Sequence, residues 1–214
     1  MAKRTTNTNA TAQPGPALPA EYILDGEAVQ PMQLYHNRGI WKSDTPPGVW
    51  MDEPSKIAWQ DEATGLDCII RREWSDCLGG YVGMDERHPL FGYGCRALNN
   101  AFDIQVHGGL TYSRACDEAG PEDRRVCHIG EPGQSHSEMW WVGFECDHSY
   151  DRRPRLPSDH PTEIHGAYRD INYVYRQTTQ LAAQIHAIAN GKPMPELASP
   201  PPPIALDHRD LGRA

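Results

Sequence analysis

The chain has 214 residues, 38% of them hydrophobic, and is therefore long enough to bury one core of ordinary size. Its 29 acidic and 20 basic residues give a formal net charge of −9. This charge argues against nonspecific binding to nucleic acid or to an anionic membrane, because lysine and arginine supply the attraction to phosphate in both cases. No apolar run approaches the length of about 18 residues that a transmembrane helix needs, and residues 1–19 lack the hydrophobic segment of a signal peptide. We therefore expect a cytoplasmic protein with no membrane partner.

The composition along the chain predicts one folded domain, residues 21–192, between two tails. Residues 1–20 are polar and interrupted by prolines, which is typical of a disordered segment. Residues 21–60 carry scattered aromatic side chains among turn signals, so we expect them to wrap the core irregularly. Residues 193–214 form a proline-rich tail, in which Pro200–Pro203 is either a spacer or a recognition peptide.

Residues 67–71 and 79–83 predict two short strands, and a third strand is predicted at residues 103–113, where polar and apolar side chains alternate. The apolar face consists of Ile104, Val106, Leu110 and Tyr112. The other face is polar and consists of Asp103, Gln105, His107, Gly109, Thr111 and Ser113. A polar face is either the solvent side of an antiparallel sheet or a functional cleft. The pair Gly108–Gly109 favours the cleft, because glycine inside a strand usually marks a bulge or a close approach.

A fourth strand is predicted at residues 140–148, where aromatic and β-branched side chains are frequent. If this strand lies in one sheet with residues 103–113, Glu145 and Asp147 share a face with His107. Carboxylates and an imidazole beside an indole are typical of a site with perturbed pKa values. If the protein is a small hydrolase, His107 acts as a base or ligand, with Glu145 or Asp147 as its carboxylate partner. The predicted ligand-binding residues are His107, Thr111, Trp141, Glu145 and Asp151.

Six cysteines occur, and no two of them form a CxxC pair. The chain length and the lack of an export signal favour reduced thiols or metal ligands over a disulfide framework. The segments that flank the two longer predicted strands offer one tetrahedral zinc site, which consists of Cys116, Cys127, Cys146 and His148. The alternative is that Cys146 is a small core residue and that the other cysteines are incidental.

A helix is predicted at residues 168–190, where apolar side chains recur at spacings of three and four. The apolar stripe consists of Ile171, Val174, Thr178, Leu181, Ile185 and Ile188, and Asn190–Gly191 ends the helix. The stripe either docks on the sheet or forms the seam of a homodimer. We favour docking, because so short a repeat is marginal as an independent coiled coil.

Strands that precede one strong helix predict an α+β fold, with a small, mostly antiparallel sheet and the long C-terminal helix packed on it. Only this arrangement hides both apolar strand faces and the helix stripe. The predicted core consists of Trp140, Val142, Phe144, Ile104, Val106 and Leu110, packed against Leu181 and Ile185.

Several segments resemble a group of uncharacterised proteins that are common in bacteriophage and prophage genomes. In chain order they are Gly65–Arg71, Cys77–Gly83, His88–Gly92, Val106–Ser113, Trp140–His148 and Tyr168–Asp170. The resemblance covers residues 48–190 and implies a phage gene that is expressed in a bacterial host cell. It implies no activity, but it does imply a pattern of acid, cysteine, histidine and second acid at Glu145, Cys146, His148 and Asp151, with a His-Gly-Gly element at His107. This chain departs from the pattern at Glu145, where an aspartate is expected, and at Asp147 and Tyr150, where small residues are expected.

Three classes of function remain open. The sequence contains no nucleophile elbow, phosphate-binding loop, dinucleotide fingerprint or HExxH motif. We therefore favour a phage accessory protein that binds a host protein or a small, nucleotide-like ligand. The alternatives are a small metal-assisted or acid/base hydrolase and a virion-associated structural protein.

Overall fold

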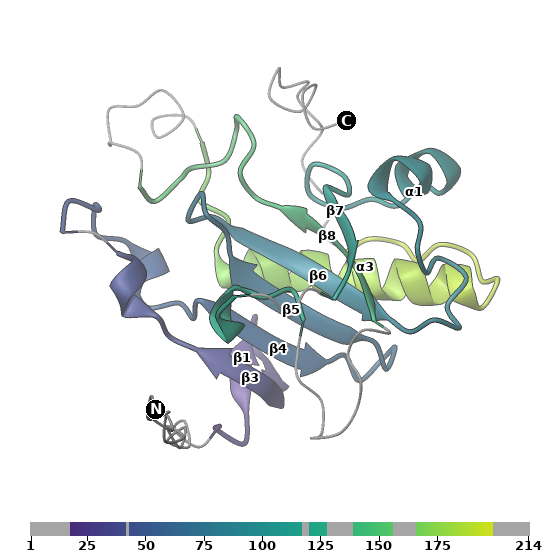
Figure 1. Ribbon diagram of the computed structural model, residues 1–214, viewed down its shortest axis with the longest axis horizontal. Coiled ribbons are helices and arrows are strands. Elements are labelled where there is room, and N and C mark those ends of the chain that lie inside the picture. The colour runs from purple at the N-terminus through teal and green to yellow at the C-terminus, as the bar shows by residue number, and fades with distance from the viewer. Residues whose placement is uncertain (1–17, 42, 117–119, 128–138, 156–165, 199–214) are drawn as a thin grey trace, which may run out of the picture.

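The computed structural model describes residues 18–41, 43–116, 120–127, 139–155 and 166–198. It confirms an α+β fold in which antiparallel strands pack against a long C-terminal helix (Figure 1). A hairpin is formed by β1 (Tyr22–Leu24) and β2 (Glu27–Val29). The main sheet has the strand order β3-β4-β5-β6-β8-β7, with β3 (Pro31–Tyr35), β4 (Lys56–Gln60), β5 (Asp67–Arg72), β6 (Leu78–Met84), β7 (Tyr112–Ala115) and β8 (Trp140–Glu145). The helices of the described residues are α1 (Cys95–Ala101) and α3 (Ile171–Ala189), with short 3-10 helices η1 (Arg38–Ile40), η2 (Val49–Met51) and η3 (Glu122–Arg124).

The N-terminal part of the domain is more regular than predicted, because β1, β2, β3 and β4 lie where an irregular wrap was expected. Asp25 and Gly26 join β1 to β2, and both have positive φ angles, 51° and 86°. Such angles belong to the tight turn that matches the twist of a hairpin, and Asp-Gly is a common sequence signal for it. The alternation of polar and apolar side chains in these strands was not recognised, because β1 has 3 residues and β3 only 5, which is too few to show a repeat. Most of both predicted tails lies outside the described residues.

The inner strands β4, β5, β6 and β8 of the main sheet are buried on both faces, and their side chains alternate between the faces. The face that α3 covers contributes Ile57, Trp59, Cys68, Ile70, Leu78, Val82, Val142 and Phe144 to the main core. The opposite face carries a smaller cluster, Ala58, Ile69, Tyr81 and Trp141, which Val126 covers. The alternation predicted for residues 140–148 is confirmed over β8, because Val142 and Phe144 lie on the helix side and Trp141 lies on the other, but the strand already ends at Glu145.

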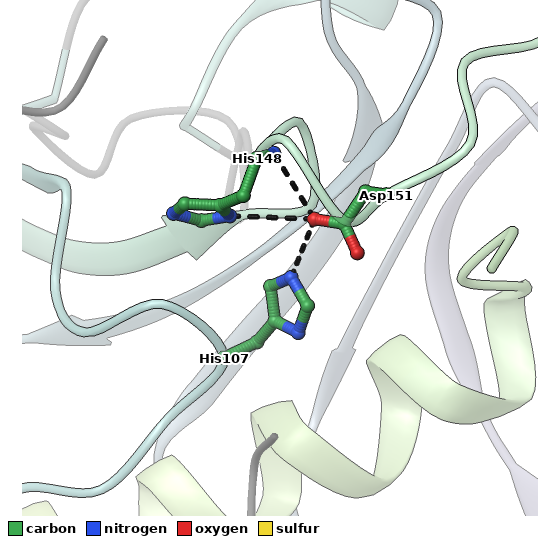
Figure 2. A group of neighbouring side chains, drawn as sticks. All are labelled: His107, His148 and Asp151. Carbon is green, nitrogen blue, oxygen red and sulfur yellow. Dashed lines mark hydrogen bonds and ion pairs between the residues drawn. The ribbon is translucent and has the colours of Figure 1, made fainter. Parts of the chain in front are cut away.

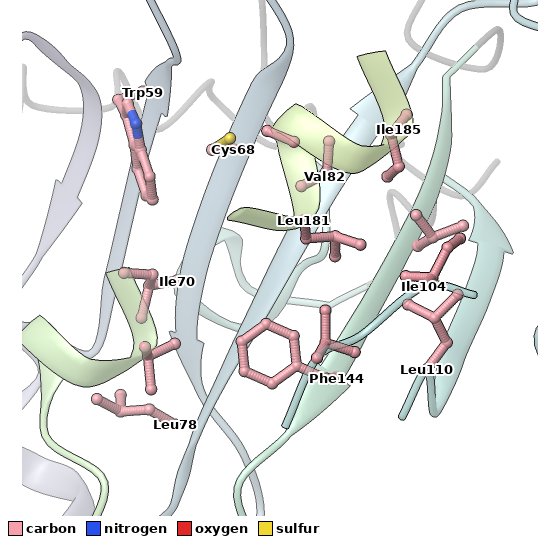
Figure 3. Close-up of a cluster of buried hydrophobic side chains, with 14 of the residues drawn as sticks. Trp59, Cys68, Ile70, Leu78, Val82, Ile104, Leu110, Phe144, Leu181 and Ile185 are labelled. Carbon is pink, nitrogen blue, oxygen red and sulfur yellow. The ribbon is translucent and has the colours of Figure 1, made fainter. Parts of the chain in front are cut away.

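The predicted core is confirmed in its main contacts. Figure 3 shows Leu181 and Ile185 of α3 beside Phe144, Ile104 and Leu110, all in one buried cluster. Trp140, which was expected in the same core, is only partly buried against it. The predicted strand at residues 103–113 is wrong over most of its length, because β7 begins only at Tyr112. The apolar side chains before β7 are nevertheless buried, so alternation identified the core face without a strand.

Helix α3 lies where the apolar stripe predicted it. Asp170 caps its start, since the Asp170 carboxylate accepts a hydrogen bond from the Tyr173 amide, and Gly191 follows its end with a φ of +59°. Leu181, Ile185 and most of the stripe are buried against β5 and β6 of the same chain. Docking on the sheet is therefore confirmed, and the same side chains are not free to form a dimer seam.

Gly80 lets α3 approach the sheet closely. A Cβ atom on Gly80 would lie 2.1 Å from Thr178 Oγ1 and 2.8 Å from the Phe144 ring. The Thr178 hydroxyl already donates to the Val174 carbonyl at 2.7 Å, so it cannot turn away without losing that bond. The helix therefore packs against bare backbone at this point of β6.

We expect Gly80→Ala to lower the free energy of unfolding by about 1–3 kcal/mol, because the added methyl group overpacks the interface between helix and sheet. Thr178→Ala removes the nearest atom, so the double variant should recover part of that loss. Urea denaturation of the wild type, the two single variants and the double variant measures this coupling. Strictly additive effects of the two substitutions would contradict the close approach.

Candidate metal centre

Three polar side chains meet beneath the surface at one end of the sheet. His107, His148 and Asp151 each offer one ligand atom, and these atoms lie within 4.8 Å of one another. The exposed fractions are 0% for His107 and Asp151 and 3% for His148. Figure 2 shows both imidazoles converging on the Asp151 carboxylate. Such a buried group needs mutual hydrogen bonds, a metal ion or both.

The His-Gly-Gly element forms a turn that admits the ring of His148. The Gly109 amide donates to the Val106 carbonyl at 3.0 Å, and φ is +65° at Gly108 and +80° at Gly109. A Cβ atom on Gly108 would lie 2.1 Å from His148 Cε1 and Nε2. Only glycine fits here, because the imidazole packs directly on the backbone and the conformation is left-handed. This requirement also explains why the predicted strand is interrupted.

A tight turn after β8 places the other two side chains. The Asp151 amide donates to the His148 carbonyl at 3.0 Å, and the His148 amide donates back to Asp151 Oδ2 at 3.0 Å. Asp151 also forms an isolated bridge with Ala167, three residues before the cap of α3. The turn is therefore held both from within and by the segment that leads into the helix.

The Asp151 carboxylate is the centre of the hydrogen-bond network. Its Oδ2 atom lies 2.7 Å from His107 Nε2 and 3.3 Å from His148 Nδ1. Its Oδ1 atom accepts from Arg169 Nε at 2.9 Å. The second ring nitrogen of His107, Nδ1, lies 2.8 Å from the Tyr173 hydroxyl. Each of the two rings of the cluster is thus oriented by a partner, which is the arrangement expected around a functional imidazole.

The environment favours an ionised Asp151 and a neutral His107. Burial alone would raise the pKa of Asp151, but hydrogen bonds from His107, His148 and Arg169 outweigh it and hold this pKa well below its usual range. Burial lowers the pKa of His107, although the hydrogen bond to Asp151 opposes the shift. A carboxylate beside neutral imidazole is the protonation state in which these groups bind metal ions.

The structure brings His107 and Asp151 together, but in a buried cluster and not in the functional cleft that was expected. It does not bring Glu145 to His107. Glu145 has the strand parity of Trp141, on the opposite face, where its charge acts on Glu73. The expected shared face assumed that His107 lies in a strand, whereas it lies in a turn.

Asp147 does not belong to the cluster of ligand atoms, and Thr111 is occupied through its backbone. The Thr111 amide pairs with the Gly143 carbonyl at 3.0 Å, just before β7. The Asp147 carbonyl accepts from Arg153. The carboxylate that His107 contacts is therefore Asp151, and neither Glu145 nor Asp147 is its partner in this fold.

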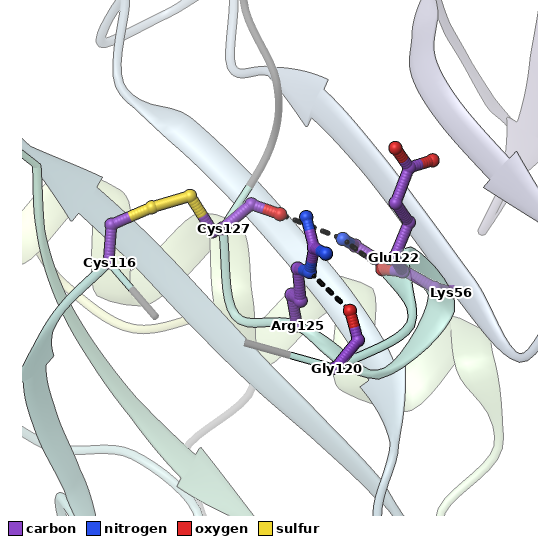
Figure 4. The surroundings of a disulfide bond; sticks show 6 residues. All are labelled: Lys56, Cys116, Gly120, Glu122, Arg125 and Cys127. Carbon is purple, nitrogen blue, oxygen red and sulfur yellow. Dashed lines mark hydrogen bonds between the residues drawn. A yellow bond between two sulfur atoms is a disulfide. The ribbon is translucent and has the colours of Figure 1, made fainter. Parts of the chain in front are cut away.

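The expected zinc set of Cys116, Cys127, Cys146 and His148 is not assembled. Cys116 and Cys127 form a disulfide with each other, so the expectation of reduced thiols fails for this pair (Figure 4). Cys146 is a free, buried cysteine of the main core, as in the alternative interpretation of this residue. His148 belongs to the cluster with His107 and Asp151. The spacing of the two cysteines, 11 residues, gave no sign of the pairing.

Buried cations anchor the disulfide loop to the second face of the sheet. Lys56 Nζ donates to the carbonyls of Glu122 and Cys127 at 2.9 and 2.8 Å (Figure 4). Arg71 lies beside Lys56 on the next strand and pairs with Glu73 at 2.8 Å. Burial raises the pKa of Glu73 to about 7, although Arg71 opposes the shift. Lys56 and Arg71 bond to the loop that covers them, and Glu73 pairs with Arg71, so we assign these charged groups a structural role.

Two residues of the site were missed by sequence reasoning. Arg169 lies in Tyr168–Asp170, a segment that contributed to the family resemblance but received no role. Tyr173 lies in the first turn of α3, next to the apolar stripe, and nothing in its spacing marks it as a partner of His107.

Comparisons of the chain with protein-family models, with curated proteins and with solved structures find no match. Among the described residues, no helix has both the length and the apolar character needed to span a membrane. The interpretation of the site therefore depends on its own chemistry.

Proposed function

We propose that this protein binds a divalent transition-metal ion through His107, His148 and Asp151. The observation that carries the proposal is the convergence of two imidazole nitrogens and a carboxylate oxygen, all buried, within 4.8 Å of one another. Imidazole and carboxylate are common ligands of zinc and its neighbours in the periodic table. Three protein ligands are also the number found in zinc sites that keep one position for a ligand from outside the protein.

The distances between the ligand atoms support this proposal. Ligand atoms about 2.1 Å from a tetrahedral zinc ion lie about 3.4 Å from one another. Asp151 Oδ2 lies 3.3 Å from His148 Nδ1 and 2.7 Å from His107 Nε2. The two histidine nitrogens lie within 4.8 Å of each other, so side-chain movements on the order of 1 Å would bring the three ligand atoms around a common ion.

The hydrogen-bond partners of the three ligand side chains also support the proposed metal site. Metal-binding histidines usually bond through their second ring nitrogen to a fixed partner, and metal-binding carboxylates are themselves hydrogen-bonded. His107 Nδ1 has the Tyr173 hydroxyl at 2.8 Å, and Asp151 Oδ1 has Arg169 Nε at 2.9 Å. The same contacts also complete a hydrogen-bond network without a metal ion, so the two interpretations are separated by experiment.

We expect the purified full-length protein to carry about one equivalent of metal, measured by elemental analysis, and to melt at a lower temperature after treatment with a chelator. His148→Gln and His107→Gln should lose the stoichiometric metal, because each removes one of the three ligands. His186→Gln, in the last turn of α3, is the matched control and should keep it.

Replacement of the metal by Co²⁺ offers a second measurement, because the visible absorption of Co²⁺ reports on its ligands. A wild-type protein that binds no metal beyond the level of the two ligand variants, with a melting temperature unchanged by chelator, would show that the cluster is a hydrogen-bond network only.

A further inference from the structure

The guanidinium of Arg169 is held in one orientation beside the cluster. Its Nε atom donates to Asp151 Oδ1 at 2.9 Å. Its Cζ atom lies 4.9 Å from the centre of the Tyr173 ring, at the distance of a cation–π contact. The hydrogen bond from Nε and the contact with the Tyr173 ring together restrict the rotation of the guanidinium. The Arg169 side chain is 19% exposed, whereas the Asp151 side chain is fully buried. Arg169 therefore extends from the cluster toward solvent.

The two terminal nitrogens of Arg169 are unused. Within the part of the chain that the structure describes, they donate to no backbone or side-chain acceptor. The two arginines at the end of β5 behave differently. Arg72 donates through its terminal nitrogens to the carbonyls of Trp50 and Asp76 and to Glu53. Arg71 donates through its own to Glu73 and to the Arg124 carbonyl.

A fixed guanidinium with both terminal nitrogens free is a fork that matches two oxygens of one anion. Because it is already oriented, little conformational entropy is lost when an anion binds. The local charge also favours an anion. Asp151 is the only carboxylate of the cluster, it is shared with His107, His148 and Arg169, and a bound metal ion would add positive charge.

We propose that Arg169 recognises a phosphate-type oxoanion next to the metal ion, through its two terminal nitrogens. This inference rests on the proposed metal site and names the class of ligand that the site takes. The anion comes either as the free ion or as a phosphate ester, and the recognition chemistry is the same for both.

The experiment uses the full-length protein loaded with Co²⁺. Inorganic phosphate and phenyl phosphate are titrated in separate arms, and binding is followed by the paramagnetic broadening of the ³¹P resonance. We expect saturable broadening with the wild type. Arg169→Lys keeps the charge but loses the fork, and Arg169→Gln loses both, so each should weaken phosphate binding by about tenfold or more. Arg176→Gln is the matched control and should leave binding unchanged. Arg176 lies on α3 and also pairs with a carboxylate, that of Asp25 in the β1–β2 turn.

Cobalt content is measured on every sample, which separates the two proposals. A wild-type protein that holds no Co²⁺ contradicts the metal site itself. A protein that holds Co²⁺ but shows no saturable phosphate broadening, or binds phosphate equally well as Arg169→Lys, overturns the role of Arg169 alone. Tighter binding of phenyl phosphate than of inorganic phosphate supports an ester as the ligand, and the reverse order supports the free ion.

Discussion

Replacing Phe144 with alanine is expected to lower the free energy of unfolding by about 3–5 kcal/mol, the cost of removing a large buried aromatic side chain. Phe144 is fully buried at the centre of the main core, where β8 meets α3. Its ring also borders Gly80, the position of closest approach between helix and sheet. The surrounding backbone is held in the sheet ladder and cannot collapse to fill the cavity. Urea denaturation followed by circular dichroism measures the loss.

Ile23→Ala is the control for this prediction, because Ile23 is 60% exposed in the β1–β2 hairpin. It should change the free energy of unfolding by about 0.5 kcal/mol or less. A similarly small effect of Phe144→Ala would mean that β8 does not present this side chain to the helix, and the arrangement of the core would have to be reconsidered.

We expect Asp151→Ala to lower the free energy of unfolding by about 3 kcal/mol, in addition to abolishing metal binding. Asp151 is fully buried and bonds to His107, His148 and Arg169. Its removal leaves buried donors without an acceptor and a partly buried guanidinium without its counter-ion, and both are costly. The measurement is made with and without chelator, so that the loss of the hydrogen-bond network is separated from the loss of the metal.

The effect of Asp151→Ala should depend on pH. The folded-state pKa of Asp151 lies below its usual value of 3.8. The folded state therefore binds fewer protons than the unfolded state at this group, and Asp151 contributes stability that is present above about pH 4 and lost as the pH falls further. The difference in stability between wild type and variant should accordingly be largest near neutral pH and shrink in acid.

Asp103→Ala is the matched control, because Asp103 is exposed and bonds only to the neighbouring Gln105 side chain, at 3.2 Å. We expect a change of about 0.5 kcal/mol or less. A pH-independent effect of Asp151→Ala would contradict an ionised, hydrogen-bonded carboxylate at the centre of the site.

The features that could be predicted from the sequence are those encoded by local periodicity. The apolar stripe of α3 and the alternation of β8 both follow from the repeat of the backbone, so the helix, its docking face and Phe144 as a core residue could be identified from spacing alone. The burial of Ile104, Val106 and Leu110 was also predictable, although their segment is not a strand. Short strands such as β1 gave too few repeats to be recognised.

The site depended on contacts that no local pattern encodes. His107 and Asp151 are 44 residues apart, and they meet because a glycine turn and a turn after β8 end at the same place. If His107 lay in a strand, alternation would put its side chain on the same face of the sheet as that of Glu145. His107 lies in a turn instead, and the alternation of faces does not apply to a side chain outside the strand ladder.

The sequence by itself determined the fold class, the helix and the core side of β8, because each depends on the spacing of side chains along one regular element. Only the tertiary structure decided that Cys116 pairs with Cys127, that His148 meets His107, and that Arg169 leads from their cluster to solvent. The physical reason is that these contacts are fixed by where separate turns and helix ends come to lie, and that placement is a property of the packed domain as a whole.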